Sequence, residues 1–243
     1  MKKLFFLLLA LPTAVFASGA EVHLDKAPVN AHDQESLQRG ARVFVNYCLN
    51  CHGASYSRYN RMQDFGLTEQ QIKDNLLFAA EKPGEPMAVA MRIGDAKAWF
   101  GAPPPDLSVI TRSRGADWVY TYLRSFYRDD TRPTGWNNTV FDKVGMPHVL
   151  HELQGQMAPV YHTEKNAEGH EHQVMDRLEL IKPGKITQAE YDALVGDLVN
   201  YLAWMGEPAK NSRMNIGLAV LLFLGIFYVV AFYLKKEFWK DVH

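Results

Sequence analysis

Cysteine is scarce in this 243-residue sequence, in which Cys48 and Cys51 are the only two. No second cysteine pair exists, so a structural zinc site built on four ligands is not indicated. Positive charge is not in excess either, since 26 Lys and Arg residues stand against 27 Asp and Glu residues. Without a basic stripe, nothing indicates a nucleic-acid interface. The chain also has no internal repeat and no low-complexity tract, so the search for function turns to short local motifs.

The two cysteines belong to one motif, Cys48-Leu49-Asn50-Cys51-His52, which reads C-x-x-C-H. A thioredoxin-like redox motif would need a βαβ context, which the flanking pattern lacks. The spacing fits covalent attachment of a c-type haem. Two thiols three positions apart can add to the two vinyl groups on one edge of a haem, and His52 can then give an imidazole nitrogen to the iron. The motif therefore predicts one covalently attached haem c.

Residues 1–17 have the pattern of a secretory signal peptide. Two lysines follow Met1, an apolar run extends to Leu11, and Ala17 fits a small-residue cleavage site. A cut after Ala20 is the alternative. Export supports the haem interpretation, because the chain would be sent to the compartment in which c-type haems are attached.

A second apolar run extends from Met214 to Leu234, 21 residues without a charged side chain. As a helix it would be about 32 Å long at ~1.5 Å per residue, enough to cross a ~30 Å hydrocarbon core. Three lysines after it fit a cytoplasmic end under the positive-inside rule. We predict four segments: a signal peptide (1–17), a haem domain (18–210), a transmembrane anchor (211–234) and a cytoplasmic tail (235–243).

Helical signals dominate the region between the two apolar runs. Asp33 suits the N-cap of a helix to about Tyr47, whose apolar face leads into the haem motif. Thr68 and Thr187 each open a capping box, which predicts helices reaching about positions 80 and 205. Another helix is expected over 117–127, where three aromatic residues are spaced by four. The fold class predicted is mostly α.

Residues 161–177 are polar and carry three histidines. His170 and His172 could act together on a metal, but we expect this stretch to be a solvent-exposed loop. Met87 and Met91 are expected to be packing residues.

The haem iron would need a sixth ligand, and two methionines close to prolines are candidates. A thioether stabilises ferrous iron relative to imidazole and raises the reduction potential, which suits an electron carrier. We favour Met157, in the stretch Met157-Ala158-Pro159. Met146, which precedes Pro147, stays an open alternative, as do His148 and His151. A histidine ligand would give a lower potential.

A proline-rich turn at 101–105 precedes Arg112 and Arg114. A haem carries two propionate carboxylates, and an arginine fork is a natural counter-group for a carboxylate. Either arginine could bind a propionate or remain solvated.

Several stretches, taken together, resemble the cytochrome c1 family, the membrane-anchored haem subunit of the cytochrome bc1 complex, and its proteobacterial form in particular. The C-x-x-C-H motif alone is shared by all c-type cytochromes. The other stretches are more specific in combination, and a single C-terminal anchor follows them as in the family. They are Pro104-Pro105-Asp106-Leu107-Ser108, Gln156-Met157-Ala158-Pro159 and Val199-Asn200-Tyr201-Leu202-Ala203-Trp204-Met205-Gly206-Glu207-Pro208.

The resemblance implies a cytochrome c-like haem domain in which the first and last helices cross at a glycine, here Gly40. It also implies roles for individual residues. Cys48 and Cys51 would hold the haem thioethers, and His52 and Met157 would be the proximal and distal iron ligands. Pro105 would contact the cofactor, and Arg114 would pair with a propionate.

The same resemblance implies a function and partners. The chain would carry electrons from a Rieske iron–sulfur subunit to a c-type cytochrome, beside a cytochrome b subunit. Its haem domain would lie on the periplasmic side of the cell inner membrane. It would not be an enzyme on its own, but a subunit of a quinol–cytochrome c oxidoreductase. Two alternatives remain: a haem subunit of a terminal oxidase, and a haem enzyme or sensor with an open sixth site.

Overall fold

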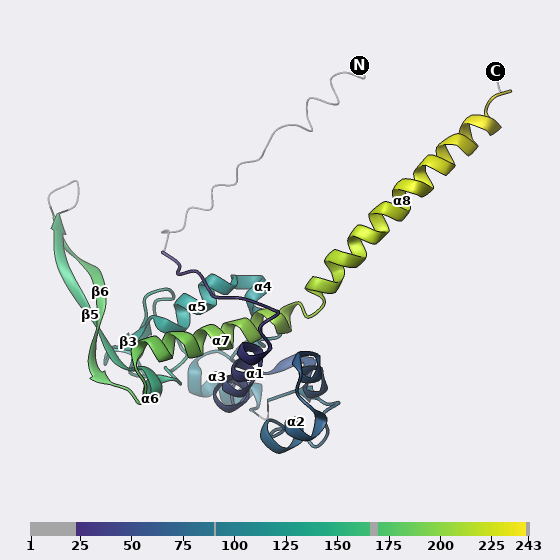
Figure 1. The fold of residues 1–243 in the computed structure, drawn as a ribbon. Coiled ribbons are helices and arrows are strands. Elements are labelled where there is room, and N and C mark those ends of the chain that lie inside the picture. Colours follow the sequence, from purple (N-terminus) through teal and green to yellow (C-terminus); the bar gives the residue numbers. More distant parts are fainter. Residues whose placement is uncertain (1–22, 90, 166–169, 242–243) are drawn as a thin grey trace.

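The computed structural model describes residues 23–89, 91–165 and 170–241, so the predicted signal peptide at 1–17 lies outside the described residues. Helices form most of the body, and one helix and one hairpin extend away from it (Figure 1). The elements in chain order are α1 (Gln34–Val43), η2 (Phe44–Cys48), β1 (Ala54–Arg58), η3 (Tyr59–Phe65), α2 (Glu69–Asn75), β2 (Pro86–Met87), α3 (Ile93–Phe100), α4 (Ile110–Arg114), α5 (Ala116–Arg124), β3 (Phe126–Arg128), β4 (Trp136–Asn138), α6 (His151–Gln154), β5 (Gly155–Lys165), β6 (Glu171–Pro183), α7 (Gln188–Gly206) and α8 (Lys210–Phe238).

Helices α1 and α7 cross at Gly40, as the resemblance implied. A Cβ at this position would lie 2.1 Å from the Asp197 carbonyl oxygen and 2.7 Å from Tyr201 Cβ. Only glycine allows the two backbones to approach this closely. Arg39 of α1 links the two helices beside this crossing, because its Nε and Nη2 donate to the two carboxylate oxygens of Asp197 in α7 at 2.6 and 3.0 Å.

An aromatic cluster fills the space beside this crossing. Phe65 meets Trp204 edge to face with 4.8 Å between ring centroids, and Phe44 packs against Tyr201 at 5.6 Å. Phe44, Phe65 and Tyr201 are almost completely buried. Tilted and edge-to-face contacts are the favoured geometries for aromatic rings, so the cluster holds α1 and α7 in a fixed relation.

The predicted helix starts are confirmed. The Asp33 carboxylate accepts the Ser36 N–H at 2.9 Å, and complete capping boxes open α2 at Thr68 and α7 at Thr187. Helix α2 ends at Asn75, earlier than position 80.

The segment before α1 is tied to the helices that follow it. Asp25 and Ala27 donate backbone N–H groups to Thr121 Oγ1 and Asp117 Oδ1, both at 2.8 Å. Arg124 binds Asp25 at 2.6 Å and also holds both carboxylate oxygens of Asp192. These contacts join the N-terminal arm, α5 and α7.

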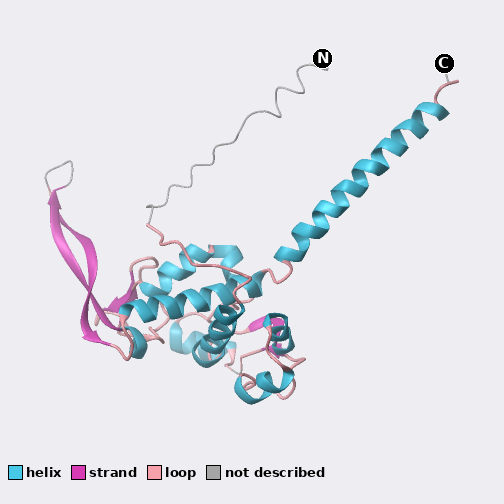
Figure 2. Cartoon of the chain, viewed as in Figure 1, coloured by secondary structure: helices cyan, strands magenta, loops and turns pink. Residues whose placement is uncertain are grey.

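The region 161–177 was expected to be a solvent-exposed loop, and its described part is exposed but is not a loop. Residues 161–165 and 171–177 belong to a long antiparallel hairpin of β5 and β6, which accounts for most of the strand structure in Figure 2. The pairing extends from Gly155 opposite Pro183 to Lys165 opposite Glu171. Backbone pairing across the hairpin replaces the loop, although most of its side chains are still exposed to solvent.

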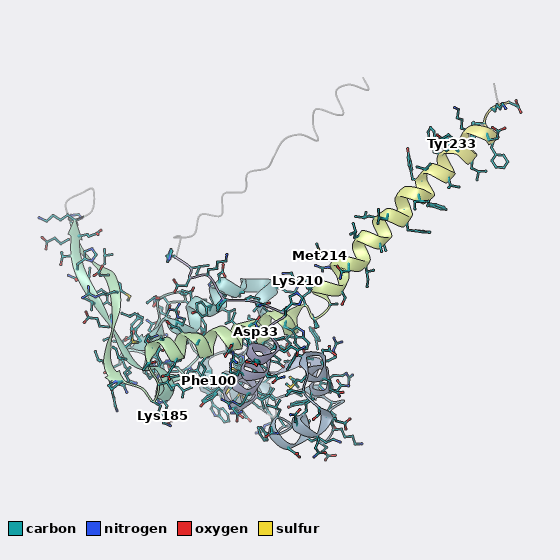
Figure 3. All side chains as sticks on the ribbon, viewed as in Figure 1. Asp33, Phe100, Lys185, Lys210, Met214 and Tyr233 are labelled. Atoms are coloured by element: carbon teal, nitrogen blue, oxygen red, sulfur yellow. The ribbon has the colours of Figure 1, made fainter. Side chains whose placement is uncertain are left out.

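Helix α8 contains the predicted transmembrane anchor. The stretch Ser212–Phe238 is long and apolar enough to cross a membrane, and none of its most apolar window is buried by the rest of the chain. Figure 3 shows Met214 near the base of this helix and Tyr233 near its far end, away from the helical body. Helix α8 starts at Lys210, and the boundary of the anchor at 211 stays a prediction.

Candidate haem site

A cavity of about 510 Å³ lies beside the C-x-x-C-H motif. Its walls come from the motif, the proline-rich turn, α5 and the loop before α6, and they are mainly apolar. Of the residues predicted for the site, the structure brings Cys48, Cys51, His52, Pro105 and Arg114 to this cavity.

The motif begins at Cys48, the last residue of the π-helical turn η2, which continues α1. Helical hydrogen bonding continues through the motif, because Cys51 and His52 donate backbone N–H groups to the Cys48 carbonyl oxygen at 3.1 and 2.8 Å. Both cysteines are free thiols. Burial, with a smaller effect from Cys51, raises the pKa of Cys48 to about 12.

The His52 ring is oriented by a backbone carbonyl. Its Nδ1 lies 2.7 Å from the Pro105 carbonyl oxygen, which can only accept, so Nδ1 carries the proton and donates it. Burial lowers the pKa of His52, although the Pro105 contact and the Asp106 charge partly oppose this effect. The ring is therefore neutral near pH 7 and keeps the Nε2 lone pair, as a metal-binding imidazole requires.

The turn that carries Pro105 is fastened to the residues that follow the motif. Leu107 donates its N–H to the Gly53 carbonyl oxygen at 2.8 Å. The Asp106 carboxylate accepts backbone N–H groups from Ser55 and Ser108, both at 2.8 Å. Burial raises the pKa of Asp106, but the hydrogen bonds from Ser108 and Ser55 outweigh it and lower the pKa overall. The sequence pattern identified this turn but not the orienting role of its carbonyl.

The structure places the two candidate methionines in different surroundings. Met157 lies in β5, paired with Leu180 of β6, and it is not among the residues that line the cavity. Met146, on the loop between β4 and α6, does line the cavity, and its Sδ accepts a hydrogen bond from Tyr122 at 3.4 Å. Met146 thus belongs to the cavity wall, whereas the assignment of Met157 as the sixth ligand stays a prediction.

His148 and His151, the two histidines that were open alternatives for the sixth ligand, form hydrogen bonds away from the cavity. His148 is buried, donates from Nε2 to Gln154 Oε1 at 2.7 Å, and stacks on Phe126. Burial lowers the pKa of His148 to about 4, so its ring is neutral. His151 donates from Nδ1 to the His148 carbonyl oxygen at 2.9 Å. Neither ring lines the cavity.

Arg114 ends α4 at the cavity wall and is exposed to solvent. Its guanidinium lies 5.2 Å from the centroid of the Trp118 ring. Within the described part of the chain it forms no ion pair with a carboxylate. Its charge is thus available to a carboxylate of a bound group, whereas Arg112 does not line the cavity.

This set of side chains fits a haem c. It supplies two thiols, a neutral imidazole, a thioether and a cation around an apolar space. In the described ranges no group of three or more His, Cys, Asp or Glu residues could hold a metal ion without a macrocycle.

Comparison with known proteins agrees with this chemistry. Residues 24–242 match the model of the Cytochrome C1 family. The chain belongs to the cytochrome c1 family. It is 50% identical to cytochrome c1 of Allochromatium vinosum over the whole of both chains. It is also 50% identical, again over both whole chains, to a Nitrosomonas europaea protein named ammonia monooxygenase gamma subunit. Cytochrome c1 of Rhodospirillum rubrum is 31% identical over 87% of this chain and 83% of its own.

Membership of this family settles the class and the cofactor. Cytochrome c1 proteins carry a covalently attached haem c and are the haem subunits of bc1-type complexes. The fold class, mostly α with a C-terminal apolar helix that could span a membrane, is confirmed.

Proposed function

We propose that this chain takes electrons one at a time from a Rieske iron–sulfur subunit and delivers them to a c-type cytochrome, beside a cytochrome b subunit. One observation carries the proposal. The apolar cavity is lined by the C-x-x-C-H motif, and the Pro105 carbonyl holds the His52 ring so that its Nε2 lone pair stays available. With His52 and a methionine as its two protein ligands, the iron would have no open position for a substrate, which suits electron transfer.

Different residues would hold different parts of the cofactor. When bound, haem c supplies a one-electron ferric/ferrous couple. Cys48 and Cys51 would form the two thioether links, and His52 would be the proximal ligand in the orientation set by Pro105. Met157 would be the distal ligand, as the family resemblance implies, and Arg114 would neutralise a propionate.

The anchor and the signal peptide support the proposed topology. Helix α8 would cross the membrane once, with Lys235 and Lys236 at its cytoplasmic end. The haem domain would then face the periplasm, on the side reached by a soluble or tethered acceptor. The chain would act as an electron-transfer subunit of a quinol–cytochrome c oxidoreductase, without making or breaking substrate bonds by itself.

Purification from membranes tests this proposal. The full-length chain, tagged after His243 and solubilised in mild detergent, should bring down an iron–sulfur subunit and a b-type haem subunit. Quinol added to that complex should reduce this chain only while the iron–sulfur subunit is present. Recovery with copper oxidase subunits, or with subunits of an ammonia monooxygenase, and without a b-type haem subunit would refute it.

A further inference from the structure

We propose that the Asp106 carboxylate, which is held against the backbone that follows His52, stabilises the oxidised form of the haem and so lowers the reduction potential of the chain. The inference rests on one part of the proposed function, the assignment of His52 as the proximal ligand, and it does not depend on which residue is the distal ligand. It gives a role to an acidic side chain that was not among the residues predicted for the haem site.

Asp106 lies at the cavity wall beside the proximal ligand. A Cβ on Gly53, the residue after His52, would lie 3.3 Å from Asp106 Oδ2, so the carboxylate occupies the space beside the bare Gly53 backbone. Pro105 directly precedes Asp106, and its carbonyl oxygen accepts the His52 Nδ1–H at 2.7 Å. The proline-rich turn thus brings one carbonyl and one carboxylate to the neighbourhood of the same ligand.

Hydrogen bonds hold this carboxylate in place as an anion. Ser55 donates its backbone N–H to Asp106 Oδ2, and Ser108 donates its own to Oδ1, both at 2.8 Å. Burial raises the pKa of Asp106, but the hydrogen bonds from Ser108 and Ser55 lower it overall, so the group is ionised at neutral pH. Within the described ranges no lysine or arginine forms an ion pair with it, and its negative charge therefore acts on the site.

A negative charge beside the proximal ligand favours the state of the site that carries more positive charge. Burial lowers the pKa of His52, and the Asp106 charge is one of the effects that oppose this, so the carboxylate acts on the His52 ring. The same attraction favours ferric over ferrous iron bound to that ring, because the ferric site carries one more positive charge. The carboxylate therefore lowers the potential, whereas a thioether ligand raises it.

The effect should be moderate, because the Asp106 side chain is exposed to solvent. Water and salt weaken the attraction between an exposed charge and its surroundings. Removal of the charge should raise the ratio of reduced to oxidised chain about fivefold at a fixed solution potential in dilute buffer. For a one-electron couple, at about 59 mV per tenfold, fivefold equals roughly 41 mV.

Asp106→Asn is the direct test, because asparagine keeps an acceptor oxygen and removes the charge. The haem-loaded, full-length protein is titrated potentiometrically at about 10 mM and about 1 M salt, where the Debye lengths are about 30 and 3 Å. If Asp106→Asn loads no haem, Asp106→Ser replaces it with the same expected result, since a serine hydroxyl can accept from the turn more weakly.

The matched control is Asp74→Asn. Asp74 is also exposed and accepts a hydrogen bond from Gln70 at 2.8 Å, but it lies in α2 and does not line the cavity. This variant removes the same charge from a different part of the domain, and it should leave the ratio close to that of wild type.

We expect Asp106→Asn to raise the ratio about fivefold in dilute buffer and by less than about twofold at high salt. An unchanged or lowered ratio, or equal shifts in the two variants, would overturn the inference. A shift of the same size at both salt concentrations would overturn it as well, because salt screens a charge but not a distorted turn.

The proposed function is tested separately, by co-purification and by the absorbance of the wild type. If wild type has a low-spin iron and brings down the expected subunits while Asp106→Asn leaves the ratio unchanged, only the role of Asp106 is wrong. If the expected subunits are absent but Asp106→Asn shifts the ratio as predicted, the partner assignment is wrong and the role of Asp106 stands. An iron without a histidine ligand would overturn both.

Discussion

Asp106 directly follows Pro105, whose carbonyl orients the His52 ring, and it stabilises the turn that contains both residues. Its carboxylate accepts two backbone N–H groups, from Ser55 and Ser108, and so closes the turn onto the strand after the haem motif. Asp106→Ala should therefore lower the free energy of unfolding by about 1–2 kcal/mol, since hydrogen bonds to a charged acceptor are worth more than neutral ones. Denaturant titration of the haem-loaded protein measures this loss.

Asp95→Ala is the matched control for that experiment. Asp95 is paired with the exposed Arg92 on α3, and a surface ion pair of this kind contributes under about 1 kcal/mol. Equal losses in the two variants would show that Asp106 has no special role in the turn.

The lowered pKa of Asp106 predicts how this contribution depends on pH. Because the pKa is lower in the folded state, the stabilisation is fully present above the unfolded value, about 4, and is lost as the pH falls through the folded value. The stability difference between wild type and Asp106→Asn should therefore be larger at pH 7 than at pH 3. A difference that is constant over this range would contradict the assignment.

Residue identity alone could not decide between Met146 and Met157. Both precede a proline by one or two positions, and both lie in the same region of the sequence. The structure places Met157 opposite Leu180 in the hairpin and Met146 at the cavity wall, while the stretch Gln156-Met157-Ala158-Pro159 carries the family resemblance that favours Met157. The covalent half of the site was predictable because Cys48, Cys51 and His52 are contiguous in the sequence.

At the scale of elements, the crossing of α1 and α7 depends on Gly40. A Cβ there would overlap the Asp197 carbonyl oxygen, which is backbone and cannot turn aside. Gly40→Ala should cost about 2–3 kcal/mol, at the upper end of the range for overpacking. The measurement is the unfolding midpoint, together with the yield of haem-loaded protein.

Gly94→Ala provides the comparison for Gly40. Gly94 lies in α3 with nothing within 4 Å of an added Cβ, so alanine should be neutral or stabilise by up to about 1 kcal/mol. If Gly40→Ala behaves like Gly94→Ala, the two helices do not cross at Gly40.

The helices were more predictable than the strands for a physical reason. Capping boxes at Thr68 and Thr187 are local patterns whose hydrogen bonds form within one turn. The β5–β6 hairpin has no such signal, because its polar and apolar residues do not alternate regularly and Pro159, which is unusual within a strand, lies in β5. Its pairing becomes evident only when both strands are placed side by side.

At the scale of the whole molecule, α8 stands apart from the haem domain. Its apolar window is not buried by any other part of the described chain, so the domain does not depend on it for its core. A chain that stops after Pro208 should move from the membrane fraction to the soluble fraction and keep its haem spectrum. Fractionation followed by absorbance spectroscopy tests this, and a truncated chain that stays in the membrane or loses its haem would contradict it.

The proposed function depends most directly on a methionine ligand to the haem iron. Absorbance of the oxidised, full-length protein detects this ligand. Wild type should show the weak red band of a sulfur–iron bond and should not bind carbon monoxide readily when reduced. Met157→Ala should lose the band, bind carbon monoxide and have a lower potential, whereas Met146→Ala should resemble wild type in all three. The opposite pattern, with the band lost in Met146→Ala and retained in Met157→Ala, would contradict the proposed site.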